Sequence, residues 1–210
     1  MTPKQHRGFS LIELAIALAV LAILAGSILQ GRELLSGAKV QSVISDLSSL
    51  ETALLGFESR YAALPGDFAA ADPAGLPGGN GNGNGLIEGA EEARVYVHLA
   101  RAGFLKGNFE TPGAQATACT ARVCKESVLS GLMIISNNLA GPTTPEGALS
   151  VLVADGAPVK LLAEIDRKLD DGNPLRGSVQ VLVADTEACT TGQAWNEAGN
   201  ARCAAVYTLR

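Results

Sequence analysis

The chain has 210 residues, of which 47% are hydrophobic and 18% charged, and its formal net charge at neutral pH is −5. An acidic balance of this kind gives no argument for a nucleic acid partner and suits an exported soluble domain. The length allows one globular domain beyond the N-terminal segment, large enough to bury its own core.

The first thirty residues carry a basic start followed by a long apolar run. Lys4, His6 and Arg7 precede a segment that continues to about Leu29 and contains one acidic residue, Glu13. About 20 apolar residues cross the hydrocarbon core of a bilayer, whereas a cleavable secretory signal has a shorter apolar stretch. An ionised side chain at the bilayer centre costs about 2.5 to 3.5 kcal/mol, so Glu13 calls for a partner that neutralises it.

The hexapeptide around this glutamate has a recognisable form. Gly8, Phe9 and Glu13, in the order Gly-Phe-Ser-Leu-Ile-Glu before the apolar run, resemble the type IV prepilin signature shared by pilins and type II secretion pseudopilins. The resemblance covers roughly the first thirty residues. It implies cleavage between Gly8 and Phe9, N-methylation of Phe9, and pairing of the new amine with Glu13 of a neighbouring subunit, which would neutralise two buried charges.

The resemblance also implies a fold and partners. We expect an α+β, type IV pilin-like fold, with a leader over residues 1–8, a transmembrane and assembly half of a long helix over 9–30, its amphipathic half over 31–64, and a globular head over 65–210. The implied partners are a prepilin peptidase and methyltransferase, inner-membrane assembly machinery, and self or other pilins in a filament. An ordinary single-span anchor is the competing interpretation.

Positive charge before the span predicts a cytoplasmic N-terminus and a periplasmic head, which would later join an extracellular filament. Four cysteines in an exported domain predict two disulfides. Three connectivities are open, and we favour the local pairs Cys119–Cys124 and Cys189–Cys203. Neither pair has the spacing of zinc ligands. In pilins a disulfide near the C-terminus commonly bounds a variable surface region, and we expect Trp195 inside this loop to belong to the core rather than the surface.

The amphipathic half of the helix follows from apolar spacing. Apolar residues recur three or four positions apart, which places them on one helical face. They are Val40, Val43, Leu47, Leu50, Leu54, Phe57, Tyr61 and Leu64. Pro65 and Gly66 predict the end of the helix at about Leu64.

A loop rich in glycine, proline and asparagine follows, up to about Gly85. Asn80, Asn82, Asn84 and Glu91 have the spacing of an EF-hand-like calcium loop, although three asparagines replace the usual aspartates. Alternating asparagine and glycine is also typical of a flexible turn-rich loop. Calcium is therefore a possible ligand on spacing alone, and we expect no other cofactor.

The rest of the chain predicts two helices and four short strands. The helices are expected over Glu88–Ala102 and Leu161–Leu169, the second ended by Asp170-Asp171-Gly172-Asn173-Pro174. The strands are expected over Val128–Ser136, Leu149–Ala154, Ser178–Ala184 and Ala204–Leu209. Asp170 and Asp171 could suggest catalysis or a metal, but solvated carboxylates in a polar turn are the better interpretation.

No enzyme constellation is present: the chain lacks a Gly-x-Ser-x-Gly elbow, a phosphate-binding loop and a nucleotide fingerprint, and His98 is the one histidine beyond the leader. The sequence therefore predicts a structural subunit, a pilin or minor pilin of a type IV pilus-like filament, whose head could serve adhesion, motility or aggregation. A type II secretion pseudopilin is the first alternative. A membrane-anchored calcium- or ligand-binding module that never polymerises is the second.

Overall fold

The computed structural model describes residues 11–113 and 118–209. It divides into two compact units, residues 1–38 and 39–210, and each is described by itself. One helix, α1 (Leu11–Tyr61, 51 residues), runs from the first unit into the second. Gly8 and Phe9, the predicted cleavage position, lie outside the described residues.

The described part of the first unit is the N-terminal portion of α1. Between Glu13 and Arg32 the sequence contains no charged residue, and α1 is long and apolar enough to cross a membrane. Its large side chains are exposed on all sides rather than along one stripe, as Leu11, Ile16 and Leu21 illustrate. A helix that is apolar all round needs an apolar surrounding, either lipid or other helices.

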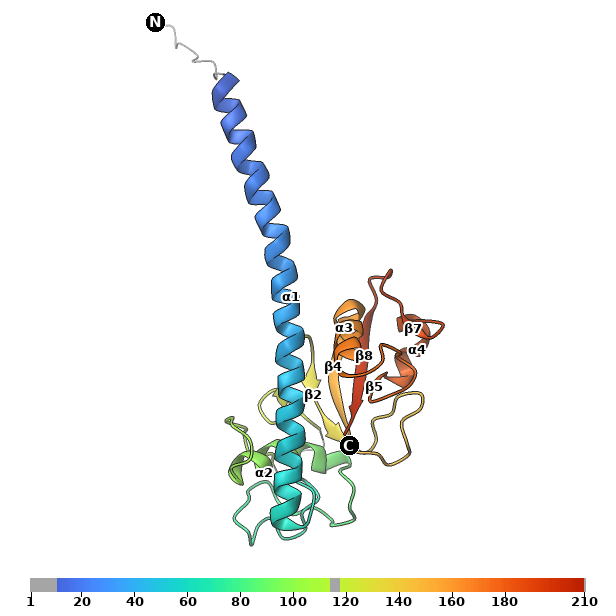
Figure 1. Ribbon diagram of the computed structural model, residues 1–210. Helices are drawn as coiled ribbons and strands as arrows, with labels where there is room; N and C mark the ends of the chain where they lie inside the picture. The colour runs from blue at the N-terminus through green and yellow to red at the C-terminus, as the bar shows by residue number, and fades with distance from the viewer. Residues whose placement is uncertain (1–10, 114–117, 210) are drawn as a thin grey trace, which may run out of the picture. The chain divides into compact units, whose positions relative to one another are not determined.

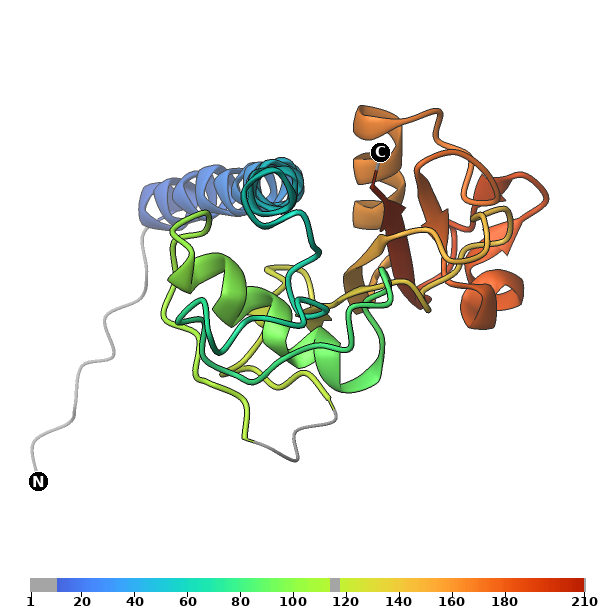
Figure 2. The same cartoon turned by 90° about the horizontal axis from the view of Figure 1, so that it is seen from below.

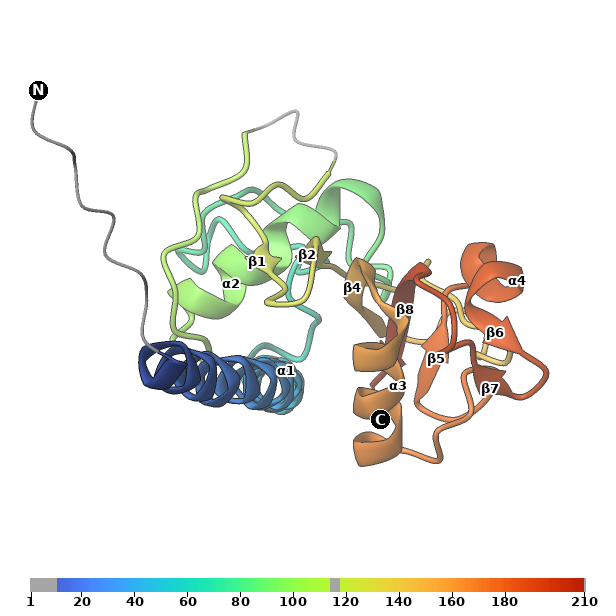
Figure 3. The same cartoon turned by 90° about the horizontal axis from the view of Figure 1, so that it is seen from above.

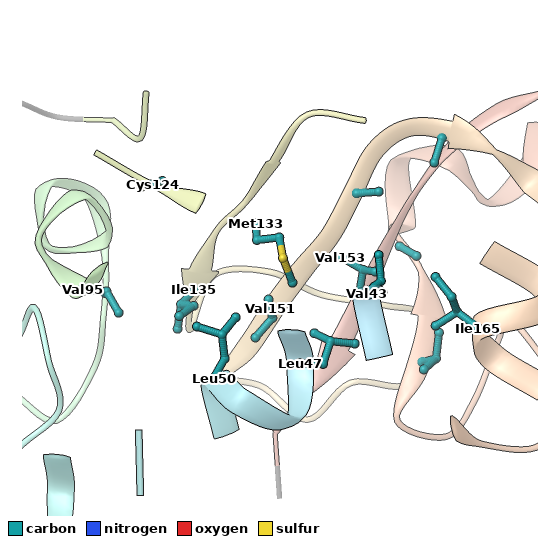
Figure 4. Close-up of a cluster of buried hydrophobic side chains, with 14 of the residues drawn as sticks. Val43, Leu47, Leu50, Val95, Cys124, Met133, Ile135, Val151, Val153 and Ile165 are labelled. Atoms are coloured by element: carbon teal, nitrogen blue, oxygen red, sulfur yellow. The ribbon is translucent and has the colours of Figure 1, made fainter. Parts of the chain in front are cut away.

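The second unit is an α+β head built around the C-terminal part of α1 and an antiparallel sheet (Figure 1). Val43, Leu47 and Leu50 of α1 are buried and lie beside Val151 and Ile135 of the sheet (Figure 4). This is the apolar stripe that the spacing predicted, because residues three and four apart share a helical face.

The sheet has four strands in the order β3-β4-β8-β5, and every neighbouring pair is antiparallel. The strands are β3 (Ile135–Ser136), β4 (Ser150–Pro158), β8 (Arg202–Thr208) and β5 (Val179–Val181). Two further pairs are two-stranded, β1 (Lys125–Glu126) with β2 (Leu132–Met133) and β6 (Thr190–Thr191) with β7 (Ala194–Trp195). The long central strands β4 and β8 form the spine of the head.

The described residues of the head contain five shorter helices. They are the 3-10 helix η1 (Gly89–Arg94), α2 (Val95–Arg101), α3 (Val159–Leu169), the 3-10 helix η2 (Val183–Asp185) and α4 (Thr186–Cys189). Seen from below, α2 lies beside the C-terminal end of α1 (Figure 2). Seen from above, α3 packs along the sheet, and α4, β6 and β7 gather beyond the edge strand β5 (Figure 3).

The two faces of the sheet are covered unequally. Alternate residues of β4, such as Val151 and Val153, join the main core with α1 and α3, whereas Leu152 belongs to a smaller cluster with Ala204 and Val206 of β8. Successive side chains of a strand point to opposite faces, so this division follows directly from the strand period. The main core therefore ties α1 to the head.

The α+β fold class expected from the sequence is confirmed, with differences at element boundaries. Helix α1 ends at Tyr61, three residues before the predicted end, because Ala62 adopts a left-handed conformation with φ 52°. The predicted strand over Val128–Ser136 is wrong as one strand: β2 and β3 pair with different partners, β1 and β4. The predicted helix over Glu88–Ala102 begins as a 3-10 turn.

Candidate functional site

Glu13 lies in the first turn of α1. A carboxylate at this position is favoured by the partial positive charge of a helix N-terminus. Its neighbours along α1 are the exposed apolar residues Leu11, Ile12 and Leu14. Among the described residues no ion pair includes Glu13. Glu13 is thus an acidic residue directly before the uncharged stretch of α1 that extends to Arg32.

The glycine-rich loop of the head is organised around a carboxylate that the sequence analysis did not single out. Asp67 is buried, and its Oδ1 accepts hydrogen bonds from the N–H groups of Gly83 (2.7 Å) and Asn84 (3.1 Å), while its Oδ2 accepts one from Gly85 (2.8 Å). A carboxylate oxygen can accept more than one hydrogen bond, so Asp67 holds three successive N–H groups of the loop. The only sequence signal was an acid directly after the helix-ending Pro65 and Gly66.

The predicted calcium ligands lie in this loop with their oxygens already engaged. Asn80 accepts the N–H of Asp72, Asn82 that of Asn84, and Asn84 that of Leu86. These are side-chain-to-backbone bonds typical of tight turns.

Glu91, the one acidic ligand of the predicted calcium set, also accepts backbone hydrogen bonds. Its Oε1 accepts the N–H of Asn82 at 2.9 Å, and it forms a capping box with Glu88 at the start of η1. A carboxylate oxygen can accept a further bond, so these contacts leave calcium binding as a prediction.

The cysteines form two disulfides, Cys119–Cys124 and Cys189–Cys203, with Cα separations of 5.5 and 6.1 Å. The first is adjacent to the two-stranded sheet of β1 and β2. The second joins the end of α4 to the central strand β8 and closes a loop that contains β6 and β7. Both cysteines of the second disulfide are fully buried, so it is part of the core.

Trp195 lies in that closed loop and is 5% exposed. Its indole Nε1 donates a hydrogen bond of 2.7 Å to Oδ2 of Asp166 on α3. Oδ1 of Asp166 accepts the N–H of Gly172 at 3.1 Å. Burial raises the pKa of the Asp166 carboxyl to about 6, and the two hydrogen bonds oppose that rise. The expected core position of Trp195 is correct, and its polar partner explains how the indole N–H is accommodated.

Asp166, Asp170 and Asp171 lie close enough together to suggest a metal site. Each has protein partners, however: Asp170 accepts the N–H of Ser178, and Asp171 accepts that of Asn173 and pairs with the Arg176 guanidinium at 2.8 Å. The hydrogen bonds and the ion pair of these three carboxylates therefore stabilise the turn after α3. The interpretation of Asp170 and Asp171 as solvated carboxylates rather than a metal or catalytic pair stays a prediction.

The N-terminal segment matches a known family model. The prokaryotic N-terminal methylation motif matches residues 3–29, a span that includes Gly8, Phe9 and Glu13. The chain carries the type IV prepilin and pseudopilin signature. Comparison with curated proteins and with solved structures found no match.

The signature supports a type IV pilin- or pseudopilin-like protein. Its family consists of structural pilin-like subunits rather than enzymes, and the motif implies processing by a prepilin peptidase and assembly with other pilins. The apolar N-terminal part of α1 fits membrane anchoring of such a pilin-like chain. The head, residues 39–210, lies entirely outside the matched motif.

Proposed function

We propose that this pilin-like chain is a structural subunit, a pilin or minor pilin, of a type IV pilus-like filament. The methylation motif joined to a helix that is exposed and apolar on all sides carries the proposal. Such a helix would be held by lipid before assembly and by the helices of neighbouring subunits afterwards. The head has its own core and two disulfides, as an exported domain requires.

In this proposal the leader over residues 1–8 is removed and Phe9 becomes the methylated first residue. The cationic amine of Phe9 would pair with Glu13 of a neighbouring subunit, so that neither charge stays unpaired in the apolar bundle. The N-terminus would be cytoplasmic and the head periplasmic before extraction, because Lys4 and Arg7 precede the span.

Substitution of Glu13 tests the assembly role. We expect Glu13→Ala to be cleaved and to accumulate in the membrane, but to be lost from sheared surface filaments, because the amine of Phe9 would lack its partner. Glu33→Ala is the matched control, since Glu33 is an exposed acid of the same helix beyond the apolar run. Normal incorporation of Glu13→Ala, or equal loss for both variants, would contradict the proposed charge pair.

A type II secretion pseudopilin is the second candidate, because the same motif is shared by both classes. A pseudopilin would be required for export of other proteins through the outer membrane rather than for long surface filaments. Deletion of the chain separates them: loss of filaments with normal secretion favours the pilin, and loss of secretion favours the pseudopilin.

A non-polymerising calcium-binding module is the third candidate, and the spacing of Asn80, Asn82, Asn84 and Glu91 favours it. Titration calorimetry of the full chain in detergent tests it at millimolar calcium. A heat of binding in the wild-type chain that disappears in Glu91→Gln would support a calcium site. The absence of any heat in the wild-type chain would rule that site out.

A further inference from the structure

Two stripes on α1 have opposite charge, and in each the two charged residues are seven positions apart. Arg32, Leu35 and Lys39 follow one another three and four residues apart. Glu51, Leu55 and Glu58 follow one another four and three residues apart. Residues at these spacings share a helical face, so each set forms a stripe in which a leucine lies between two like charges. We call them the basic stripe and the acidic stripe.

The acidic stripe borders an apolar groove in the head. The groove has a volume of about 160 Å³, and its apolar walls come from α1, the segment after it, the residue after β8 and the residue before β4. Its lining residues are Glu51, Leu54, Leu55, Glu58, Leu64, Leu149 and Leu209. Leu55 is 54% exposed at this groove, although it belongs to the described head. The groove is thus an apolar surface flanked by two carboxylates.

The basic stripe has the complementary composition. Leu35 is 65% exposed, and Arg32 and Lys39 are exposed on either side of it. None of the ion pairs formed among the described residues includes Arg32, Lys39, Glu51 or Glu58. Each stripe therefore presents an exposed leucine between two charged side chains that form no ion pair within the described residues.

We infer that the basic stripe of one copy docks in the acidic-stripe groove of a second copy, with Arg32 against Glu51, Leu35 in the groove, and Lys39 against Glu58. The inference rests on the proposed filament function and names the contact between its subunits. Charge complementarity and equal spacing select a second copy as the occupant. Exposed ion pairs are weak singly, so the buried leucine supplies most of the attraction and the charges fix the register.

The register requires neighbouring copies to be displaced along the helix. Glu51 lies 19 residues after Arg32, and Glu58 lies 19 residues after Lys39. At 1.5 Å per residue this offset corresponds to about 28 Å of helix. Two copies at the same depth in a membrane would set like stripes side by side, so the contact forms only when one copy has moved outward relative to the other.

The contact is also directional. Copies inserted in one membrane share an orientation, so their helices are parallel. A parallel contact between two different surfaces leaves one free basic stripe and one free acidic stripe at the ends of each pair. Because neighbouring copies are also displaced along the helix, such heterologous contacts continue into open assemblies instead of closing as rings. The stripes therefore account for growth of a filament from a single kind of contact.

Charge reversal in full-length chains tests the inference. Glu51→Lys with Glu58→Lys, and separately Arg32→Glu with Lys39→Glu, should each lower the amount of chain in sheared filaments, relative to the membrane pool, about tenfold. The four changes together should restore it to within about threefold of wild type. Glu126→Lys with Glu146→Lys is the control of equal charge change at exposed positions elsewhere in the head, and it should assemble normally.

The fourfold variant separates docking from folding, because it contains every substitution of the two double variants. No recovery in that variant, or normal assembly of either double variant, would overturn the inference while leaving the proposed function intact. If the wild-type chain entered no filament, the proposed function itself would fail and the inference with it.

Cross-linking gives a second, direct readout. All four native cysteines are in disulfides, so a bifunctional thiol reagent would react only with introduced thiols. Filaments of Leu35→Cys/Leu55→Cys should give a ladder of cross-linked chains, and each single variant should give none. The membrane pool should stay uncross-linked. A dimer without a ladder would indicate a closed antiparallel contact and overturn the inference.

Discussion

Asp166 shows how a buried carboxylate is retained in the head. Its two oxygens accept one N–H each, from the Trp195 indole and from the Gly172 backbone. A carboxylate is the side-chain group of this size that accepts at both atoms without donating at either. The hydrogen bond between Asp166 and Trp195 links α3 to the loop closed by Cys189 and Cys203, so it holds this C-terminal loop against α3.

The first prediction concerns Asp166→Asn. The amide NH₂ of the new asparagine would face either the Trp195 indole N–H or the Gly172 backbone N–H, and two donors cannot form a hydrogen bond with each other. We therefore expect the free energy of unfolding to fall by about 1 to 3 kcal/mol at pH 7.5. Denaturant unfolding of the full chain in detergent, followed by Trp195 fluorescence, measures it. Asp171→Asn should cost less than about 1 kcal/mol, because Asp171 is half-exposed and pairs with Arg176 at the surface. Equal losses in the two variants would contradict the role of Asp166.

His98 is fully buried, and its Nδ1 accepts the N–H of Gly66 at 3.0 Å. This bond requires an unprotonated Nδ1. Burial, and to a smaller extent the Arg94 cation, lowers the pKa of the imidazole from 6.5 to about 4, and Asp72 opposes both effects. The neutral ring therefore joins the start of the loop after α1 to α2.

The second prediction is the pH dependence that follows. His98 contributes stability that is complete above pH 6.5 and is lost as the pH falls toward 4, because the unfolded chain takes up the proton more readily. Asp166 acts in the opposite direction: its raised pKa contributes stability below pH 3.8 that is lost as the pH rises through 6. The two contributions partly cancel between pH 4 and 6.

Single variants should uncover each contribution. In Asp166→Asn the Tm should fall more steeply than in wild type between pH 6.5 and 4.5, because only the His98 contribution remains. In His98→Asn the fall should be shallower, since the amide does not titrate. Thermal unfolding across this pH range measures both slopes. Parallel profiles for all three proteins would contradict this assignment.

At the scale of elements, the loop between α1 and η1 keeps its shape through a close backbone approach. A Cβ built on Gly81 would meet backbone atoms of Asp67, and Gly81 donates its N–H to the carbonyl of Phe68 at 3.0 Å. Only glycine permits such an approach. The loop that looks flexible in sequence is therefore held against the segment that follows α1.

The third prediction is that Gly81→Ala destabilises the head. We expect a loss of about 1 to 3 kcal/mol, because the loop would have to move away from Asp67. Gly113→Ala is the matched control, since a Cβ there meets nothing within 4 Å and its φ is not positive. Denaturant unfolding of both variants checks the difference. An unchanged Gly81→Ala protein would show that the loop is not closely packed.

The sequence predicted the elements whose signal is periodic. The stripe from Val40 to Phe57 and the spacing from Leu161 to Leu169 both became helices that pack on the sheet. Strand pairing was less accessible, because the run over Val128–Ser136 changes partner between β2 and β3. A local apolar run does not indicate with which distant strand it will pair.

The polar contacts of the head were the least predictable. Asp67 and its three N–H donors are 16 to 18 residues apart, and Asp166 and Trp195 are 29 apart. Such contacts depend on the finished fold, so a sequence pattern at fixed spacing does not indicate them. The methylation motif, which includes Glu13, could be recognised from the sequence because it is contiguous in the chain.

At the scale of the whole molecule, the two units have different surfaces. The first unit contains a helical stretch without a charged residue between Glu13 and Arg32, with exposed large apolar side chains, whereas the second unit has a closed core and two disulfides. An apolar helix is stable both in lipid and in a bundle of other helices, so the same segment can anchor the chain before assembly and pack in the filament afterwards. Movement of this helix from the membrane into a filament is the central claim of the proposed function.

Mass spectrometry of the chain in sheared surface filaments tests that claim most directly. The account predicts an intact mass that begins at Phe9, carries one added methyl group and retains both disulfides. A chain that begins at Met1, or one found only in the membrane fraction, would contradict it.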